Sequence, residues 1–100
     1  MKNLLRIGIL GAGHIAEKMA KTIAAMPDVT ILAVASRSME RAQDFAARYA
    51  IERAYDSYET LVCDADVDLV YVATPHSHHY QHARLALEHD KPVLVEKAFT

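Results

Sequence analysis

The sequence has little of what several common classes of protein require. Its 100 residues contain one cysteine, Cys63, and no tryptophan. A single thiol cannot form a disulfide framework or a thiolate metal site, and Cys63 is expected to be a partly buried structural residue. No apolar run reaches the roughly 18 residues of a membrane-spanning helix. Residues 1–7 lack the long apolar stretch of a secretory signal and lead into a strand. These absences favour a cytoplasmic protein with no membrane partner.

An excess of charge of one sign is also missing. The chain carries 11 Lys and Arg against 13 Asp and Glu, a formal net charge of −2. Without a basic excess, nucleic acid and anionic membranes are not expected as main partners. The chain is 52% hydrophobic and 24% charged, which is typical of an ordinary globular domain. One hundred residues are enough for a single domain with its own core.

Glycine is scarce too, yet two of the three glycines stand together in Gly-Ala-Gly-His-Ile-Ala, residues 11–16. An apolar strand precedes this segment and a helical pattern follows it. Gly11 permits a tight turn, Gly13 leaves room for a phosphate to approach the backbone, and Ala16 lets the helix pack closely on the strand. The helix that follows offers free N–H groups and a positive dipole end, with His14 as a further donor. The motif predicts the pyrophosphate site of a dinucleotide.

Strand and helix patterns alternate along the rest of the chain. Strands are expected over residues 6–10, 29–35, 53–55, 68–73 and 92–95. Helices are expected over 14–26, after a Ser38 cap through about 49, in a Ser57-capped turn to 62, and over 78–89. This alternation predicts a doubly wound α/β fold, a Rossmann-type parallel sheet with right-handed crossovers. The chain stops just after a strand, so residues 1–100 are expected to be the amino-terminal portion of a truncated dinucleotide-binding domain.

The end of the second strand is expected to select the dinucleotide. An acidic residue there would bind the ribose hydroxyls of NAD, but the sequence reads Ala35-Ser36-Arg37-Ser38, with Arg41 one turn further on. Arg37 can form a forked contact with a phosphate or stack on adenine, and Ser36 can donate a hydrogen bond. These residues favour NADP over NAD. The alternative is that Arg37 and Arg41 are solvated charges at a helix start.

Thr74-Pro75-His76-Ser77-His78-His79 follows the fourth strand. Pro75 ends that strand, and the hydroxyl and imidazole groups are placed to contact the ribose or the nicotinamide. Because His78 and His82 are four residues apart, with His76 and His79 nearby, a metal site is the alternative. No cysteine or carboxylate completes an evident ligand set, so no metal is predicted. His82 and His89 are expected to be ordinary surface residues.

Glu96-Lys97 ends the fifth strand, where a charged pair has no packing role. Beside an oxidised nicotinamide, the positive charge and partial desolvation would lower the pKa of Lys97 toward the range useful for proton transfer. Lys97 is therefore the candidate catalytic residue. A solvated pair after an edge strand is the alternative.

Taken together, these segments resemble the glucose–fructose oxidoreductase, inositol dehydrogenase and MocA family. The glycine loop GAGHIA, the strand end VASRS, the segment TPHSHH and the terminal Glu-Lys fall in the order and spacing of its amino-terminal half. The resemblance implies reversible oxidation of a sugar, polyol or diol carbinol with NAD or NADP. Lys97 matches the lysine of the family's Glu-Lys-Pro motif, although Ala98 replaces the proline. His76 replaces the asparagine of a Thr-Pro-Asn-x-x-His segment, as in a subgroup with the NADP-linked dihydrodiol and xylose dehydrogenases.

The resemblance also implies a second α+β domain that carries the substrate pocket, and a homo-oligomer at full length. The resulting hypothesis is the NADP-binding domain of a CH–OH oxidoreductase, inactive by itself. A non-catalytic NADP-binding sensor is the alternative, and loss of turnover in Lys97→Ala would separate the two. A methyltransferase is disfavoured because Ser36-Arg37 replaces the usual acid. The residues expected at the cofactor are Gly11, Gly13, His14, Ile15, Ser36, Arg37, Arg41, Thr74, Pro75, His76, His79, Glu96 and Lys97.

Overall fold

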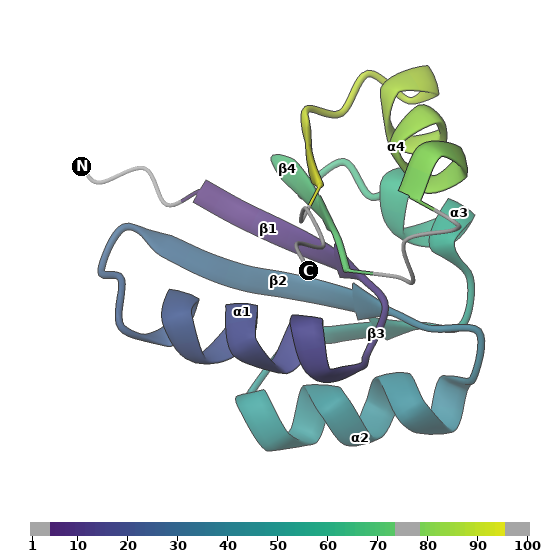
Figure 1. The fold of residues 1–100 in the computed structure, drawn as a ribbon. Coiled ribbons are helices and arrows are strands. Elements are labelled where there is room, and N and C mark those ends of the chain that lie inside the picture. Colours follow the sequence, from purple (N-terminus) through teal and green to yellow (C-terminus); the bar gives the residue numbers. More distant parts are fainter. Residues whose placement is uncertain (1–4, 74–78, 96–100) are drawn as a thin grey trace, which may run out of the picture.

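The computed structural model describes residues 5–73 and 79–95, with the side chains of His14, Ile15, His79, Tyr80 and Val95 left aside. Within these ranges the chain forms a parallel sheet in the order β3-β2-β1-β4-β5 (Figure 1). The strands are β1 (Leu5–Leu10), β2 (Val29–Ala35), β3 (Arg53–Tyr55), β4 (Leu69–Val72) and β5 (Val93–Val95). The strand order reverses between β1 and β4, which is the switch point of a doubly wound sheet. The predicted fold class is confirmed.

The helices connecting these strands cover both faces of the sheet. They are α1 (His14–Ala24), α2 (Met39–Tyr49), α3 (Tyr58–Val62) and α4 (His79–Glu88). Helices α1 and α2 lie on one face, and α3 and α4 on the other (Figure 1). None of the helices in the described ranges is long and apolar enough to span a membrane.

Each face of the sheet has its own apolar core, because neighbouring strand residues point to opposite sides. Ile7 and Ile9 of β1 pack with Phe45 of α2 on the first face. Leu10 packs with Leu61 of α3 on the second. Burial on both faces accounts for the nearly continuous apolar sequence of β2.

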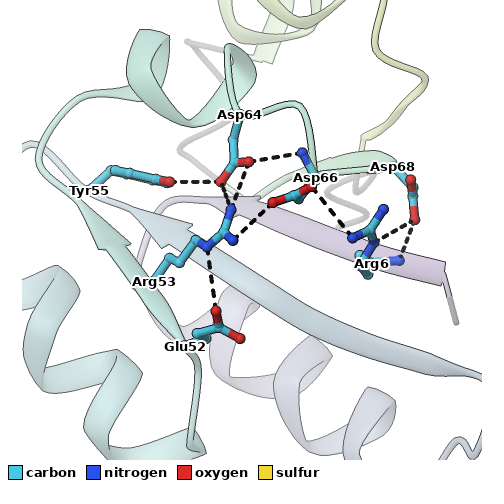
Figure 2. A network of polar contacts seen from close by, with 7 residues as sticks. All are labelled: Arg6, Glu52, Arg53, Tyr55, Asp64, Asp66 and Asp68. Carbon is cyan, nitrogen blue, oxygen red and sulfur yellow. Dashed lines mark hydrogen bonds and ion pairs between the residues drawn. The ribbon is translucent and has the colours of Figure 1, made fainter.

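A network of ion pairs joins the strands near the amino-terminal ends of β1 and β4, away from the glycine loop (Figure 2). Arg53 of β3 lies 2.7 Å from an oxygen of Asp64 and 2.9 Å from one of Asp66. The backbone N–H of Arg6 donates to Asp68 over 3.0 Å. These contacts fix the connection between α3 and β4 against the sheet.

Several expectations about local structure were wrong in detail. Helix α1 ends at Ala24 rather than Met26, because Pro27 disfavours the helical conformation at the residue before it. Ser57 occupies the N-cap position of α3, but its side chain forms no capping hydrogen bond. Cys63 is exposed rather than partly buried, because it is the C-cap residue that follows α3.

Candidate functional site

The carboxyl ends of the central strands meet at one edge of the sheet. The backbone N–H of Gly11 donates to the carbonyl of Ala35 over 2.8 Å, and that of Ala73 donates to Leu10 over 2.9 Å. These bonds hold the ends of β1, β2 and β4 together. The predicted site residues that follow β1 and β2 therefore lie at the same edge of the sheet. Ligand sites in doubly wound sheets lie at this edge.

The glycine loop has the backbone that the sequence predicts. Gly11 has a φ of 108°, a backbone conformation that residues other than glycine rarely adopt. Gly13 is the N-cap of α1, without a side-chain cap, and a Cβ atom built on it would meet nothing within 4 Å. Ala16 is fully buried. Open space above Gly13 and an uncapped helix end fit the phosphates of a dinucleotide.

The end of β2 turns into α2 through a short polar segment. The side chain of Ser38 caps α2 by accepting a hydrogen bond from the backbone N–H of Arg41 over 3.3 Å. Ser36 is buried, and its hydroxyl oxygen accepts from the N–H of Ser38 over 3.3 Å. Arg37 and Arg41 are exposed. The turn thus fixes the backbone that carries both arginines while their side chains reach solvent.

Arg41 and the glycine loop share one open hollow of about 400 Å³. Two carboxylates and a second arginine from α1 and α2 also line it. The complete lining is Ala12, Gly13, Glu17, Arg41, Asp44 and Arg48. The structure therefore brings the predicted residues Gly13 and Arg41 to one site, although they are far apart in the sequence.

The arginines of the chain differ in their partners. Arg6, Arg48, Arg53 and Arg84 each form an ion pair with a carboxylate. Among the described residues, no such pair involves Arg37 or Arg41. Arg41, which has no carboxylate partner and lies beside the uncapped start of α1, can bind an anion without first losing an ion pair.

Tyr58 of α3 and His82 of α4 lie in contact on the other face of the sheet. Their rings meet edge to face with centroids 4.5 Å apart. His82 is consequently buried, at 7% exposed, so its assignment as a surface residue was wrong. Burial raises the pKa of Tyr58, while the positive charge of Arg37 opposes that rise.

Part of the predicted site lies outside the described residues. This holds for Thr74, Pro75 and His76 after β4, for Glu96 and the catalytic candidate Lys97, and for the side chains of His14, Ile15 and His79. His76 and His78, which belong to the alternative reading as a metal site, also lie outside the described residues. In the part that the structure describes, no three histidine, cysteine or acidic residues gather as a metal site would require.

The sequence reasoning missed the charged residues Glu17, Asp44 and Arg48, which line the hollow with Arg41. A signal for two of them was available. Residues three, four and seven apart share one helix face, so Asp44 and Arg48 follow Arg41 along the same side of α2. Glu17 comes from another helix, and only the fold could add it.

Fold and glycine loop together define a Rossmann domain of the dinucleotide-binding type. Residues 5–100 match the family model described as "Oxidoreductase family, NAD-binding Rossmann fold". The chain belongs to this family, which is the glucose–fructose oxidoreductase, inositol dehydrogenase and MocA family.

Relatives of the chain include characterised dehydrogenases. D-xylose 1-dehydrogenase (NADP⁺) of Hypocrea jecorina is 47% identical over 96% of this chain and 28% of its own length. Trans-1,2-dihydrobenzene-1,2-diol dehydrogenase of Danio rerio is 41% identical over 93% of this chain and 28% of its own length.

A solved structure is similar as well. It is a variant of a 3-ketoreductase from Actinomadura kijaniata in complex with TDP-benzene and NADP, with a TM-score of 0.89 and 34% identity over 98% of this chain and 31% of that one. The chain therefore spans less than a third of the length of these relatives.

Proposed function

We propose that the chain is the NADP-binding part of an enzyme that transfers a hydride between the cofactor and a carbinol of a sugar, polyol or diol. The observation that carries the preference for NADP is the pair Arg37 and Arg41, neither of which has a carboxylate partner among the described residues. An acidic residue at the end of β2 would repel the 2′-phosphate, but Ser36 and Arg37 stand there instead. The xylose and 3-ketoreductase relatives carry NADP in their names or complexes.

Different residues are proposed to bind different parts of the cofactor. Gly11 and Gly13 let the pyrophosphate approach the backbone, and the N-terminus of α1, with His14 and Ile15, stabilises its charge. Ser36, Arg37 and Arg41 hold the 2′-phosphate and the adenosine. When bound, the nicotinamide supplies the hydride chemistry.

The remaining assignments concern the nicotinamide end of the cofactor. Thr74, Pro75, His76 and His79 are proposed to contact the ribose and nicotinamide, and Glu96 to lie beside Lys97. Lys97 is proposed to accept the hydroxyl proton as the carbinol is oxidised. Family membership and the order of these motifs support these roles.

The relatives extend well beyond this chain, so the proposal covers a longer polypeptide. A second domain would supply the substrate pocket, and the full-length protein would be a cytoplasmic homo-oligomer with neither nucleic acid nor a membrane as a partner. The names of the relatives support a small polyhydroxy substrate.

Calorimetric titration of the chain with NADP and with NAD tests the cofactor assignment. NADP is expected to bind at least about tenfold more tightly, because a charge-assisted hydrogen bond contributes about 1.5–3 kcal/mol. Arg37→Gln and Arg41→Gln should each weaken NADP binding by about tenfold or more and change NAD binding much less. Arg84→Gln removes an exposed arginine on α4 and is the matched control. Tighter binding of NAD would refute the NADP assignment and leave the family unchanged.

A further inference from the structure

Asp44 lies between two arginines on the same side of α2. Arg41 precedes it by three residues and Arg48 follows it by four, so either guanidinium can reach its carboxylate. In the structure Asp44 pairs with Arg48, at 3.4 Å between Oδ2 and Nε. No described carboxylate pairs with Arg41, which lines the hollow beside Gly13. Arg41 is therefore open to a ligand only while Asp44 is paired with Arg48.

Arg48 is held in place by more than Asp44. Its Nη1 atom lies 3.3 Å from Oε2 of Glu17, which is in the first turn of α1. Its guanidinium carbon lies 5.7 Å from the ring centroid of Phe45 and 5.6 Å from that of Tyr49. Contacts of a cation with ring faces at such distances are attractive. One side chain therefore binds both carboxylates of the hollow and is itself fixed on two rings.

Both carboxylates would oppose the binding of a phosphate if Arg48 were absent. Glu17 lies one turn into the helix whose N-terminus faces the hollow, where it would repel an incoming anion. Asp44 would be left with Arg41 as the nearest cation on its helix face, and the two would form an i,i+3 pair. A ligand phosphate would then have to compete with Asp44 for the guanidinium.

We propose that Arg48 is a specificity-determining positioning residue, which keeps Arg41 open to the 2′-phosphate of NADP by holding Asp44 and Glu17. This inference rests on the proposed function and deepens it. Arg48 acts through its neighbours and does not itself contact the cofactor. NAD, which lacks the 2′-phosphate, does not depend on Arg41 in this way, so the arrangement affects the ratio of the two affinities.

The test is a double-mutant cycle on the chain, read by calorimetric titration with NADP and with NAD at low ionic strength. Arg48→Gln is expected to lower the ratio of NADP to NAD affinity by about two- to fivefold, since exposed ion pairs contribute up to about 1 kcal/mol. Arg48→Lys, which retains the charge, should keep most of the ratio. Arg84→Gln breaks a comparable i,i+4 pair on α4 and should leave the ratio unchanged.

The second arm of the cycle separates the indirect role from a direct one. Asp44→Asn should raise the NADP to NAD ratio at least twofold more in the Arg48→Gln background than in the unaltered chain, because only there does Asp44 turn to Arg41. Thermal unfolding of each variant checks that the fold is retained. Should Arg48→Gln not fold, Arg48→Met takes its place, since it keeps an aliphatic stem on the two rings.

Each outcome decides between the possibilities. A reduced ratio with the expected non-additivity supports the inference. An unchanged ratio in Arg48→Gln overturns it. A reduced ratio with purely additive effects also overturns it, because Arg48 would then act on the phosphate through its own charge. If the unaltered chain itself does not prefer NADP, the proposed function fails and the inference fails with it.

Discussion

Gly11 and Gly13 stand two residues apart, but the backbone requires glycine only at the first. At Gly11 the φ of 108° makes any residue with a side chain energetically unfavourable. Gly13 has a φ of −99°, which any residue adopts, and open space around its Cα. The fold therefore requires glycine at position 11, whereas glycine at position 13 is explained by the phosphate proposed to bind beside it.

Alanine at the two positions should separate stability from binding. Gly11→Ala is expected to lower the free energy of unfolding by about 1–2 kcal/mol, the cost of a left-handed conformation for a side-chain-bearing residue. Gly13→Ala should change stability by less than about 0.5 kcal/mol, yet weaken NADP binding about tenfold, the equivalent of about one hydrogen bond. Urea unfolding and calorimetric titration of both variants measure the two effects. Normal NADP binding by Gly13→Ala would argue against a phosphate at this point.

Burial of single residues was the least predictable feature at this scale. Cys63 and His82 were placed by residue type, one as structural and the other as a surface group. Their exposure instead depends on neighbours that the local sequence does not reveal. Cys63 is exposed where α3 ends, and His82 is covered by the ring of Tyr58 from the preceding helix.

At the scale of the elements, the sequence was more informative. The apolar run of β2 predicted its bounds, Val29–Ala35, and the Ser38 cap predicted the start of α2. These signals are local, since they depend on periodicity and on one side chain reaching a nearby N–H. The hollow beside Gly13 was not predicted, because Glu17 and Arg48 meet only when α1 and α2 pack on the same face of the sheet.

The contact between β1 and α3 depends on a glycine that is not part of the loop motif. A Cβ atom on Gly8 would lie 2.6 Å from Cδ2 of Leu61 and 3.1 Å from Cγ1 of Val67. Both side chains are buried, at 0% and 2% exposed, so neither can simply turn into solvent. Gly8 therefore sets how closely α3 approaches the sheet.

Gly8→Ala is expected to lower the free energy of unfolding by about 1–3 kcal/mol through overpacking. Leu61→Ala should also destabilise the protein, by leaving a cavity. The double variant should lose less than the sum of the two, because the added methyl group enters the space that the leucine vacates. Urea unfolding of the three variants tests this, and strict additivity would show that Gly8 and Leu61 do not compete for the same space.

At the scale of the whole molecule, the arginines fall into two groups that differ in their partners. At the carboxyl ends of the strands, Arg37 and Arg41 have no carboxylate partner among the described residues. In the network of Figure 2, Arg6 and Arg53 are paired with Asp64, Asp66 and Asp68. The paired arginines fix the connection between α3 and β4 on the sheet, whereas Arg37 and Arg41 keep their charge for a ligand.

Asp64 is the centre of that network. Its side chain is 7% exposed, and it accepts hydrogen bonds from Arg53, from the Tyr55 hydroxyl at 2.7 Å and from the backbone of Asp66. Burial alone would raise the pKa of Asp64, but these bonds outweigh burial and hold the pKa below its ordinary value of 3.8. The carboxylate is thus kept charged by the fold.

The depressed pKa makes stability depend on pH in a defined direction. A carboxylate whose folded pKa lies below its unfolded value contributes stability that is complete above the unfolded value and is lost as the pH falls through the folded one. The free energy of unfolding should therefore decline below about pH 4. Asp64→Asn should lower it at pH 7 by about 1–3 kcal/mol, since it replaces the charged acceptor of these hydrogen bonds. The difference between the two proteins should shrink toward pH 2.

Tyr55→Phe is the control for this prediction. It removes one hydrogen bond to Asp64 and retains the pairing with Arg53, so it should cost less at pH 7 and keep the decline in acid. Urea unfolding of the three proteins between pH 2 and 7 measures both effects. If the difference between Asp64→Asn and the unaltered chain stayed constant over this range, the charge of Asp64 would not be what stabilises the connection between α3 and β4. The contribution would then come from hydrogen bonding alone, and protonation of the network would leave the sheet intact.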